Sequence, residues 1–392
     1  MPSPKIIQFP LSELLVNEVT EEFNLQYGNK PEIVTLAPGR INIIGEHTDY
    51  NEGLAMPVAI DLWICTAISK YSKDYFSVFS INYRQSVKLL PNATNVFSEP
   101  WIKLVSSVIN ILKSEYGILG GGKIVIGGNI PIGCGLSSST AFVISVTIAF
   151  CNLFKIRLRK RELAIICKKI ENLALGLAHG LLDQYAIILS KKDQFMIIDF
   201  QDDSIKYLPL SLNGCLWIVI NSRINRELSK SAYINRVKEC RKGLEILNSW
   251  FNINSFRDID NNMLLELEKG YNIPYKRLLH LLGENIRVKK MKVQLEKGNK
   301  KQIGKILQES HESLKTLYEV SCMEIDYIVK ISESFDGWYG GRIIGGGFGG
   351  CSLHLIAENV IEKYGEYISK NLGKKYGVEP DLIQVLFPGG VS

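Results

Sequence analysis

Hydrophobic residues recur along this chain at two spacings, and each spacing predicts a different kind of element. Apolar positions three and four residues apart predict amphipathic helices in three segments of the first half, at Leu11–Tyr27, Trp101–Glu115 and Arg161–Ala178. Short apolar or alternating runs predict strands at Ile33–Ala37, Leu62–Lys70, Tyr75–Asn82 and Lys123–Ile126, and a hairpin made by Gln194–Phe200 and Ile205–Leu210.

Beyond residue 210 the pattern becomes richer in helix, so we expect one domain at 1–210 and a second at 211–392. A buried strand at Cys215–Asn221 opens the second part, and an alternating strand at Cys351–Ala357 follows a glycine-dense run. Between them we expect four helices, at Ala232–Trp250, Pro274–Leu282, Ile286–Glu296 and Gln302–Val320.

The stretch 128–141 joins a predicted strand to an apolar, helix-like run. Gly133 and Gly135 let the backbone approach a ligand closely. Ser137–Ser139 fall where a helix leaves N–H groups unpaired at its positive end, an arrangement that binds anions such as phosphate. The alternative is a plain strand-to-helix turn with Ser137 as the N-cap. A cap needs only one hydroxyl, however, and this stretch offers three beside two glycines.

Two other glycine-rich runs match common nucleotide-binding loops only in part. Residues 117–124 fit a P-loop as far as the lysine, but they lack the Ser or Thr that should follow and enter a strand. Residues 345–350 fit Gly-x-Gly-x-x-Gly, yet a strand follows where a dinucleotide fingerprint needs a helix. The anion-binding stretch belongs to neither class.

Glu171 lies within a stripe of small residues on the third predicted helix, formed by Ala164, Cys167, Ala174 and Ala178. Small residues allow close packing, so we expect Glu171 to face a crowded surface. A carboxylate in such a place needs a cation or hydrogen-bond donors beside it. The alternative is a surface glutamate at the edge of the stripe.

Composition and charge narrow the class of protein. With 392 residues, 46% hydrophobic and 22% charged, the chain is an ordinary globular sequence. The densest basic cluster, 155–161, fits a solvated helix entry better than a nucleic-acid patch, because no aromatic residues interleave. The N-terminus lacks the apolar run of a signal peptide, and the longest apolar stretch, 141–151, falls short of the ~20 residues that span a bilayer. We therefore expect a cytoplasmic protein without nucleic-acid or membrane partners.

Cysteine and histidine usage agrees with that compartment. The eight cysteines are scattered, without a Cys-x-x-Cys pair, which fits a reducing environment. The five histidines are not paired at metal-ligand spacing, so we do not expect a zinc site.

Three separated motifs together resemble the galactokinases, a family of the GHMP small-molecule kinases. Ala37–Gly53, which contains Gly-Arg-Ile-Asn-Ile-Ile-Gly-Glu-His-Thr-Asp-Tyr-Asn, is similar to the signature of that family. Pro131–Ala141 is similar to the GHMP phosphate-binding motif, and Gly345–Cys351 resembles the third, glycine-rich motif. Shorter matches lie at 180–185, 231–236, 283–288 and 310–314, so the resemblance runs from about residue 31 to 351.

The resemblance implies a two-lobed α+β fold. The N-terminal lobe would carry a mixed sheet with helices, and the C-terminal lobe an antiparallel sheet with helices, with a last strand that could return to the first lobe. It also implies a reaction in which ATP phosphorylates the anomeric hydroxyl of galactose, giving galactose 1-phosphate and ADP. The two substrates would meet in the cleft between the lobes. We expect a monomer.

The same resemblance assigns roles to individual residues. Asp183 would take the proton from the sugar hydroxyl, and Arg40 would keep Asp183 ionised while it stabilises charge on the transferring phosphate. Without the other motifs, an Asp after Gly-Leu-Leu would more often be a helix cap. The substrate-binding set implied for the sugar is Arg40, Glu46, His47, Thr48, Asp49, Gly180, Asp183 and Tyr233.

The resemblance likewise implies a nucleotide site with a metal ion. Ser139 and Glu171 would hold Mg²⁺, a hard cation that prefers oxygen ligands, and this would supply the cation that Glu171 needs. A core tryptophan explains Trp101 as well as a nucleotide contact does. The implied ATP-binding set is Ser80, Trp101, Gly133, Cys134, Gly135, Leu136, Ser137, Ser138 and Ser139.

The chain departs from the family pattern at Thr140, where galactokinases usually carry Ala, and near the sugar site at His179 and Arg226. Related sugar sensors without activity are altered just after the three serines. A β-branched residue is tolerable in the first helical turn, so we expect altered nucleotide affinity rather than inactivity. The alternatives are an anomeric kinase for N-acetylgalactosamine or arabinose, and a non-catalytic regulator that binds galactose and ATP.

Overall fold

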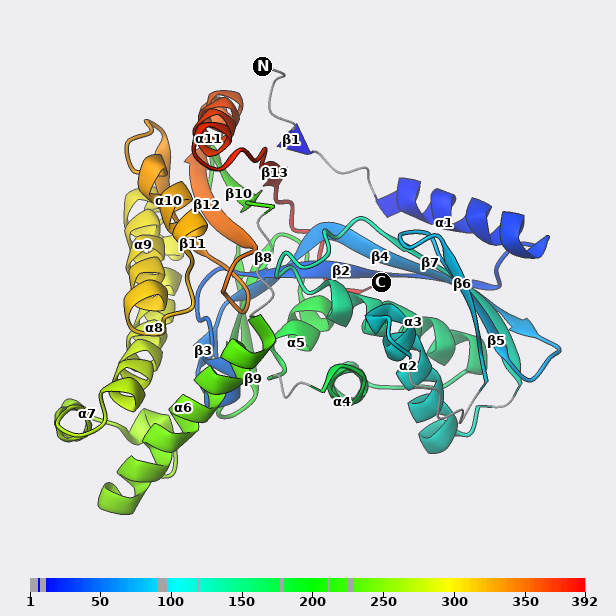
Figure 1. Ribbon diagram of the computed structural model, residues 1–392, viewed down its shortest axis with the longest axis horizontal. Helices are drawn as coiled ribbons and strands as arrows, with labels where there is room; N and C mark the ends of the chain where they lie inside the picture. Colours follow the sequence, from blue (N-terminus) through cyan, green and yellow to red (C-terminus); the bar gives the residue numbers. More distant parts are fainter. Residues whose placement is uncertain are drawn as a thin grey trace.

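The protein folds into two lobes that are joined by a small third sheet (Figure 1). The structure is a computed structural model, and it describes residues 6–7, 12–90, 97–118, 120–176, 180–210, 212–223 and 229–391.

The sheet of the first lobe has the strand order β2-β4-β7-β5-β6. Only the pairing of β5 with β7 is parallel, so the sheet is mixed, as predicted. Its strands are β2 (Ile33–Asn42), β4 (Pro57–Tyr71), β5 (Phe76–Ser80), β6 (Gln85–Leu89) and β7 (Gly121–Gly128).

Helices cover both faces of this sheet, because its central strands are apolar on both sides (Figure 1). On β4, Trp63 and Cys65 pack with Val19 of the first helix, whereas Ile64 and Ile68 point to the opposite face and join the main core. The helices of this lobe are α1 (Ser12–Tyr27), α2 (Pro100–Tyr116), α3 (Ser138–Phe154), α4 (Lys160–Leu175) and α5 (Leu182–Leu189).

The sheet of the second lobe has the order β1-β13-β10-β12-β11. The predicted antiparallel arrangement holds for four of its strands, and β1, from the start of the chain, adds a parallel pairing with β13. Its strands are β1 (Ile6–Ile7), β10 (Cys215–Asn221), β11 (Trp338–Ile343), β12 (Cys351–Ala357) and β13 (Asp381–Gln384).

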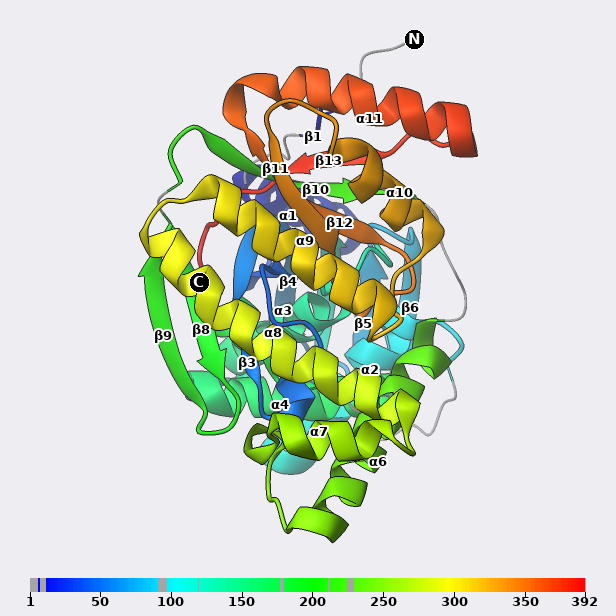
Figure 2. The same ribbon diagram turned by 90° about the vertical axis from the view of Figure 1, so that its left-hand side faces the viewer.

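Helices α8 and α9 lie side by side in front of this sheet (Figure 2). The helices of the second lobe are α6 (Ser229–Phe251), α7 (Asn261–Glu268), α8 (Asn272–Glu296), α9 (Lys300–Thr316), α10 (Met323–Ser332) and α11 (Ile361–Tyr376). Short 3-10 turns occur at Asp49–Asn51, Phe256–Asp258 and Glu358–Val360.

The third sheet contains the predicted hairpin, β8 (Gln194–Asp199) with β9 (Ser204–Pro209). Its third strand is β3 (Leu54–Ala55), which pairs with β8 and follows directly after the predicted sugar-binding loop. The hairpin therefore fixes one end of that loop.

One prediction about the second lobe was wrong. The helices expected at Pro274–Leu282 and Ile286–Glu296 are one continuous helix, α8. Glu284 and Asn285, which lie between the two expected helices, are buried against the first lobe instead of facing water at a helix end.

The domain boundary at residue 210 stays a proposal. Two segments of the chain pack on the lobe across that boundary. Strand β1 belongs to the second sheet. After β13 the chain returns to the first lobe, where the backbone carbonyl of Leu386 accepts a hydrogen bond from Asp61 N at 3.1 Å and Val391 N donates to the carbonyl of Ile187 at 3.0 Å. The return to the first lobe is thus made by the C-terminal tail, not by a strand.

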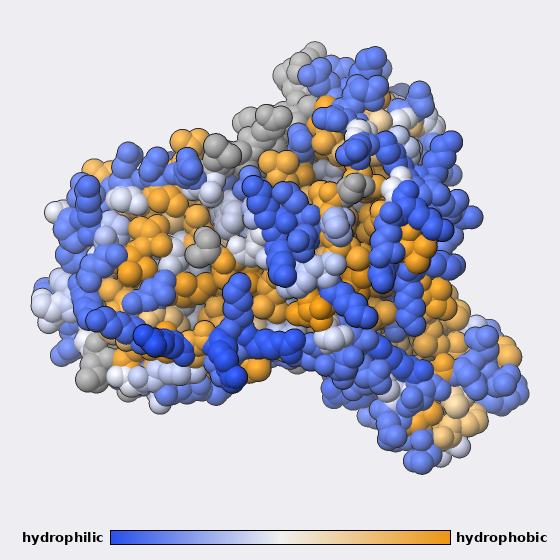
Figure 3. All heavy atoms as spheres, turned by 180° about the vertical axis from the view of Figure 1, so that it is seen from behind, coloured by the Kyte–Doolittle hydropathy of each residue, from blue (hydrophilic) through white to orange (hydrophobic). Residues whose placement is uncertain are grey.

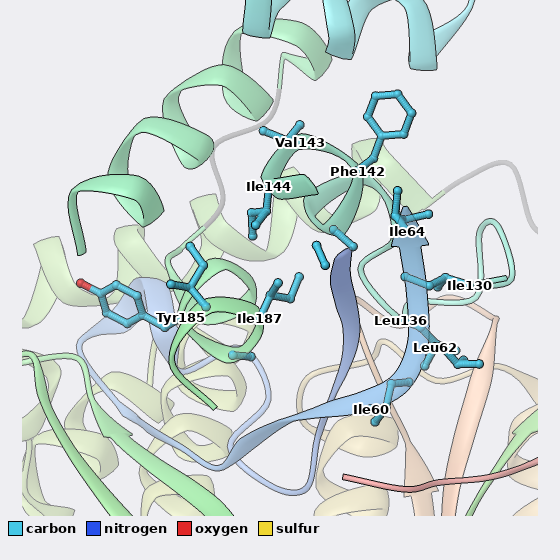
Figure 4. Packing of buried hydrophobic residues seen from close by; sticks show 14 of the residues in the cluster. Ile60, Leu62, Ile64, Ile130, Leu136, Phe142, Val143, Ile144, Tyr185 and Ile187 are labelled. Atoms are coloured by element: carbon cyan, nitrogen blue, oxygen red, sulfur yellow. The ribbon is translucent and has the colours of Figure 1, made fainter. Parts of the chain in front are cut away.

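The loop between β7 and α3 is anchored in the hydrophobic core. Ile130 and Leu136 of this loop point toward Ile60, Leu62 and Ile64 on β4 (Figure 4). Because both anchors are buried, the backbone between them is held in one place while its glycines face outward.

On the outside, hydrophilic side chains surround smaller hydrophobic areas on the face seen in Figure 3. Among the residues described, no helix combines the length and the apolar character needed to cross a membrane.

Candidate active site

The anion-binding loop takes the backbone conformation that its glycines suggested. Gly133 and Gly135 lie in the left-handed region, with φ of 77° and 72°, and Ser137 follows with φ of 59°, which is uncommon outside glycine. The loop borders a pocket of about 360 Å³. All of the predicted nucleotide-binding residues line this pocket, namely Ser80, Trp101 and residues 133–139.

Ser137 occupies the N-cap position of α3, but its hydroxyl does not cap the helix. It donates a hydrogen bond across the pocket to Oδ2 of Asp183. The plain-turn alternative therefore does not describe this residue.

Asp183 lies in the first turn of α5 and forms an ion pair with Arg40 from β2. The Arg40 Nε atom donates to Asp183 Oδ1 at 2.6 Å, and Arg40 NH1 donates to the carbonyl of Gly135 at 2.6 Å. Burial opposes the charge of Arg40, but the neighbouring Asp183 carboxylate outweighs it and raises the pKa of the guanidinium above its ordinary value. Asp183 is not a helix cap, since the cap position of α5 is Leu181.

Glu171 is buried, with 3% of its surface exposed, so the surface alternative is wrong. Its carboxylate accepts hydrogen bonds from Ser139 Oγ at 2.6 Å, from Thr140 Oγ1 at 2.9 Å and from Gln184 Nε2 at 3.0 Å. Burial raises the pKa of Glu171 to about 7; the Ser139 hydroxyl opposes the rise and the Asp183 charge adds to it. The carboxylate thus faces the nucleotide pocket with neutral hydrogen-bond partners in the described part of the chain.

The loop 45–53 is held in place by the second lobe. Glu284 Oε1 on α8 accepts from Gly45 N at 3.0 Å, and Asn285 Oδ1 accepts from Leu54 N at 2.7 Å. Within the loop, Thr48 is fully buried and its hydroxyl lies 2.9 Å and 2.8 Å from the carbonyls of Gly45 and Leu54. The Thr48 hydroxyl therefore closes the loop upon itself.

His47, which is buried, and Asp49, which is half-buried, are the two side chains of this loop that are set up to meet a ligand. His47 Nδ1 lies 2.9 Å from the Tyr50 hydroxyl, while Nε2 has no hydrogen-bond partner among the residues described. Burial lowers the pKa of His47 to about 3, so the ring is neutral. Burial, together with the charges of Asp183 and Glu46, raises the pKa of Asp49 to about 7.

The remaining predicted sugar-binding residues surround this pair. Gly180 packs directly against the Asp49 carboxylate, and a Cβ atom at position 180 would overlap it. The ring of Tyr233, from α6, lies 5.8 Å from the His47 ring and 5.7 Å from the Tyr50 ring. The structure therefore brings the loop 45–53, helix α6 and the segment before α5 together at one site.

Glu46 connects the loop to the third glycine motif. Its Oε1 atom accepts from Arg342 NH2 at 2.8 Å and from Gly345 N at 3.1 Å, and Oε2 accepts from Asn42 Nδ2 at 3.1 Å. Arg342 is fully buried and also donates to the carbonyls of Asn42 and Ile43. The two lobes are joined here by a buried ion pair.

The phosphate loop and the third glycine motif lie back to back. A Cβ atom at Gly345 would come within 3.0 Å of the Gly135 carbonyl, so a side chain at position 345 would be crowded against the phosphate loop. Beside this contact, the hydrogen bond with the Cys351 thiol lowers the pKa of the Cys134 thiol. The third glycine motif of the second lobe therefore packs directly against the phosphate loop of the first.

Sequence reasoning missed Glu284 and Arg342, which hold the sugar loop from the second lobe. Glu284 lies within the family match at 283–288, which could have pointed to it. Arg342 had no such match, and the only signal was a charged residue next to the apolar end of a strand. His179 and Arg226, the two departures near the sugar site, lie outside the described residues.

This combination of features defines a class of protein. Two lobes, a glycine-serine loop at the start of a helix, and a buried carboxylate beside it are the features of a GHMP small-molecule kinase. Family models agree, since those for the GHMP kinases N terminal domain and the GHMP kinases C terminal match residues 103–191 and 291–370. The mevalonate kinase of Methanococcus jannaschii shares the fold, with a TM-score of 0.63 and 21% identity over 91% of this chain and 98% of that one.

The particular family follows from closer matches. The model of the galactokinase galactose-binding signature matches residues 21–70. Galactokinase from Thermosipho africanus is 35% identical over 356 residues, covering 91% of this chain and 98% of that protein. The crystal structure of Lactococcus lactis galactokinase complexed with galactose superposes with a TM-score of 0.90 at 27% identity, covering 96% and 99% of the two chains. The chain belongs to the galactokinase family.

Proposed function

We propose that this protein transfers the γ-phosphoryl group of ATP to the anomeric hydroxyl of galactose and releases galactose 1-phosphate and ADP. The observation that carries the proposal is the cluster of Arg40, Ser137 and Asp183, which lies where the nucleotide pocket meets the predicted sugar loop. The charge of Asp183 contributes to the raised pKa values of both Asp49 and Tyr233, which supports a sugar site beside Asp183.

The pocket offers ATP two kinds of surface. The rings of Tyr83 and Trp101 stack 5.8 Å apart at 13° and both line the pocket, which suits a flat aromatic base. At the other end the backbone of residues 133–139 and the start of α3 suit the phosphates.

In the transfer step the O–H bond of the sugar hydroxyl breaks and its oxygen bonds to the γ-phosphorus of ATP. The bond from that phosphorus to the β–γ bridging oxygen breaks, ADP leaves with the bonding electrons, and Asp183 accepts the proton. Arg40 keeps the Asp183 carboxylate ionised beforehand and neutralises charge that develops on the phosphoryl oxygens. Positioning and charge neutralisation supply most of the catalysis in reactions of this type.

We assign the sugar hydroxyls to Asp49, His47, Glu46 and Tyr233. Because His47 is neutral and its Nε2 atom is unpaired in the described part of the chain, it can donate to or accept from one hydroxyl according to its tautomer. Thr48 is left out of direct binding, since its hydroxyl serves the loop backbone.

The residues present fit a magnesium ion at the phosphates. Glu171 supplies a buried carboxylate on the pocket wall and Ser139 a hydroxyl 2.6 Å from it, and Mg²⁺ commonly binds through one or two protein oxygens together with substrate phosphates. The ion would neutralise phosphate charge during the transfer.

We also propose that the protein works in the cytoplasm as a monomer. All eight cysteines are free thiols, which supports a reducing compartment. The residues that we assign to both substrates come from a single chain, which supports a monomer.

The test is ADP release by the purified protein with a panel of galactose, N-acetylgalactosamine and arabinose. We expect turnover with galactose, and a loss of at least 10²-fold in kcat for Asp183→Asn. Turnover with another sugar and none with galactose would replace the proposed substrate. Binding of galactose and ATP without turnover of any sugar would identify a regulator.

A further inference from the structure

We infer that Thr140 is a positioning residue for the metal site, because its hydroxyl orients the Glu171 carboxylate toward the cation. This inference rests on the proposed function in one respect, that Mg²⁺ accompanies the nucleotide. Thr140 lies on the wall of the nucleotide pocket, and its part in the metal site is exerted through Glu171.

The hydrogen bonds divide the Glu171 carboxylate into two sides. Oε2 accepts from Thr140 Oγ1 at 2.9 Å and from Gln184 Nε2 at 3.0 Å. Oε1 accepts from Ser139 Oγ at 2.6 Å and lies 3.1 Å from Thr140 Oγ1. The Thr140 hydroxyl thus reaches both carboxylate oxygens, and Oε1 together with the Ser139 oxygen is the pair of atoms that Gln184 leaves for a cation.

The local backbone explains why the Thr140 hydroxyl reaches Glu171. In a helix a Thr hydroxyl commonly turns back to the carbonyl four residues earlier. Here that carbonyl belongs to Leu136, which already accepts Arg40 N at 3.2 Å. The Thr140 side chain, 2% exposed and restricted in χ1 by its β-branch, is directed at the carboxylate instead.

A buried carboxylate that is free to rotate would accept hydrogen bonds from any nearby donor and would have no fixed orientation. The donors on the Oε2 side prevent this, in the way that outer partners of metal ligands usually fix the orientation of those ligands. Removing the Thr140 hydroxyl leaves Gln184 as the donor to Oε2, so the carboxylate loses one of the two hydrogen bonds on that oxygen.

The experiment compares Thr140→Val, which keeps the shape and removes the hydroxyl, with Thr140→Ser, which restores the hydroxyl. The matched control is Thr147→Val: Thr147 lies two turns further along α3, is equally buried, and faces the Cys167 thiol instead of Glu171. The measurement is Mn²⁺ affinity of the protein with ADP, by electron paramagnetic resonance of free Mn²⁺, which needs no sugar and no turnover.

We expect Thr140→Val to weaken Mn²⁺ binding about tenfold, Thr140→Ser to remain close to the wild type, and Thr147→Val to match it. Unchanged Mn²⁺ affinity in Thr140→Val, or an equal loss in Thr147→Val, would overturn the inference. If Thr140→Val does not fold, Thr140→Ala takes its place with the same two outcomes.

The titration also separates this inference from the proposed function. A protein without sugar turnover whose Mn²⁺ affinity depends on the Thr140 hydroxyl would support the positioning role and reject the kinase. A protein that phosphorylates galactose but binds Mn²⁺ with the same affinity in all variants would support the kinase and reject the positioning role of Thr140.

Discussion

His47 is buried and Asp49 half-buried beside other charged groups, so the charged form of each side chain is disfavoured. The Asp49 carboxylate is desolvated near Asp183 and Glu46, so its charged form is disfavoured in the folded protein. Such strain is typical of a binding site, where groups are kept ready for a ligand at the expense of stability.

Asp49→Asn should therefore stabilise the protein at high pH. The pKa of Asp49 is about 7 in the folded state and near 3.8 when unfolded, so between these values the folded state binds more protons and loses stability as pH rises. Asn is neutral throughout. We expect a higher midpoint of thermal unfolding for the variant at pH 8, equivalent to roughly 2–4 kcal/mol, and little difference at pH 4.

The control for this prediction is Asp74→Asn, at an exposed position outside the site. It should follow the wild type at every pH. A gap between Asp49→Asn and the wild type that stays constant from pH 4 to pH 8 would argue against the titration of Asp49 as its cause.

Among the elements, the segment before α5 and the loop 45–53 depend on each other most closely. Gly180 lets the chain pass directly beside the Asp49 carboxylate, and α8 holds the far side of the same loop through Glu284. The loop thus owes its shape to three elements that are far apart in the sequence.

Gly180→Ala should displace the Asp49 carboxylate, because a Cβ atom at this position overlaps it. We expect KM for galactose to rise at least tenfold, as a hydroxyl-binding group is moved off its partner, while KM for ATP changes little. Steady-state kinetics with each substrate varied in turn provides the measurement. Gly270→Ala, which meets no atom within 4 Å, is the matched control; equal KM values in the two variants would contradict this account.

Taken whole, the molecule is tied together by chain segments that cross between lobes. The C-terminal tail returns to the first lobe, where Phe387 is 6% exposed and its ring lies 5.9 Å from that of Phe195. The neighbouring Leu386 is 53% exposed. The end of the chain is therefore part of the core of the first lobe.

Phe387→Ala should lower the free energy of unfolding by about 3–5 kcal/mol, the usual cost of removing a buried phenylalanine. Leu386→Ala, one residue earlier but exposed, should change it by less than about 1 kcal/mol. Urea denaturation of both variants makes the comparison. Similar losses in the two would mean that the tail does not contribute through packing.

The reach of sequence reasoning can be judged from particular residues. The strand-to-helix glycine loop and the hairpin 194–210 were predicted correctly, because each depends on local periodicity and on backbone freedom at glycine. The mixed first sheet was also correct, but the family resemblance implied it. The break expected within α8 was wrong, because burial against another lobe overrides local polarity.

By itself, the sequence indicated a glycine-serine loop suited to an anion before α3, a need for compensation at Glu171, and motifs at 37–53 and 131–141 that belong to one family. These are properties of neighbouring residues, and short-range sterics and hydrogen bonding decide them. Only the tertiary structure decided that Ser137 turns to Asp183 and that Thr140 turns to Glu171. Those contacts join residues more than thirty positions apart, and no local pattern encodes which distant partner a hydroxyl will meet.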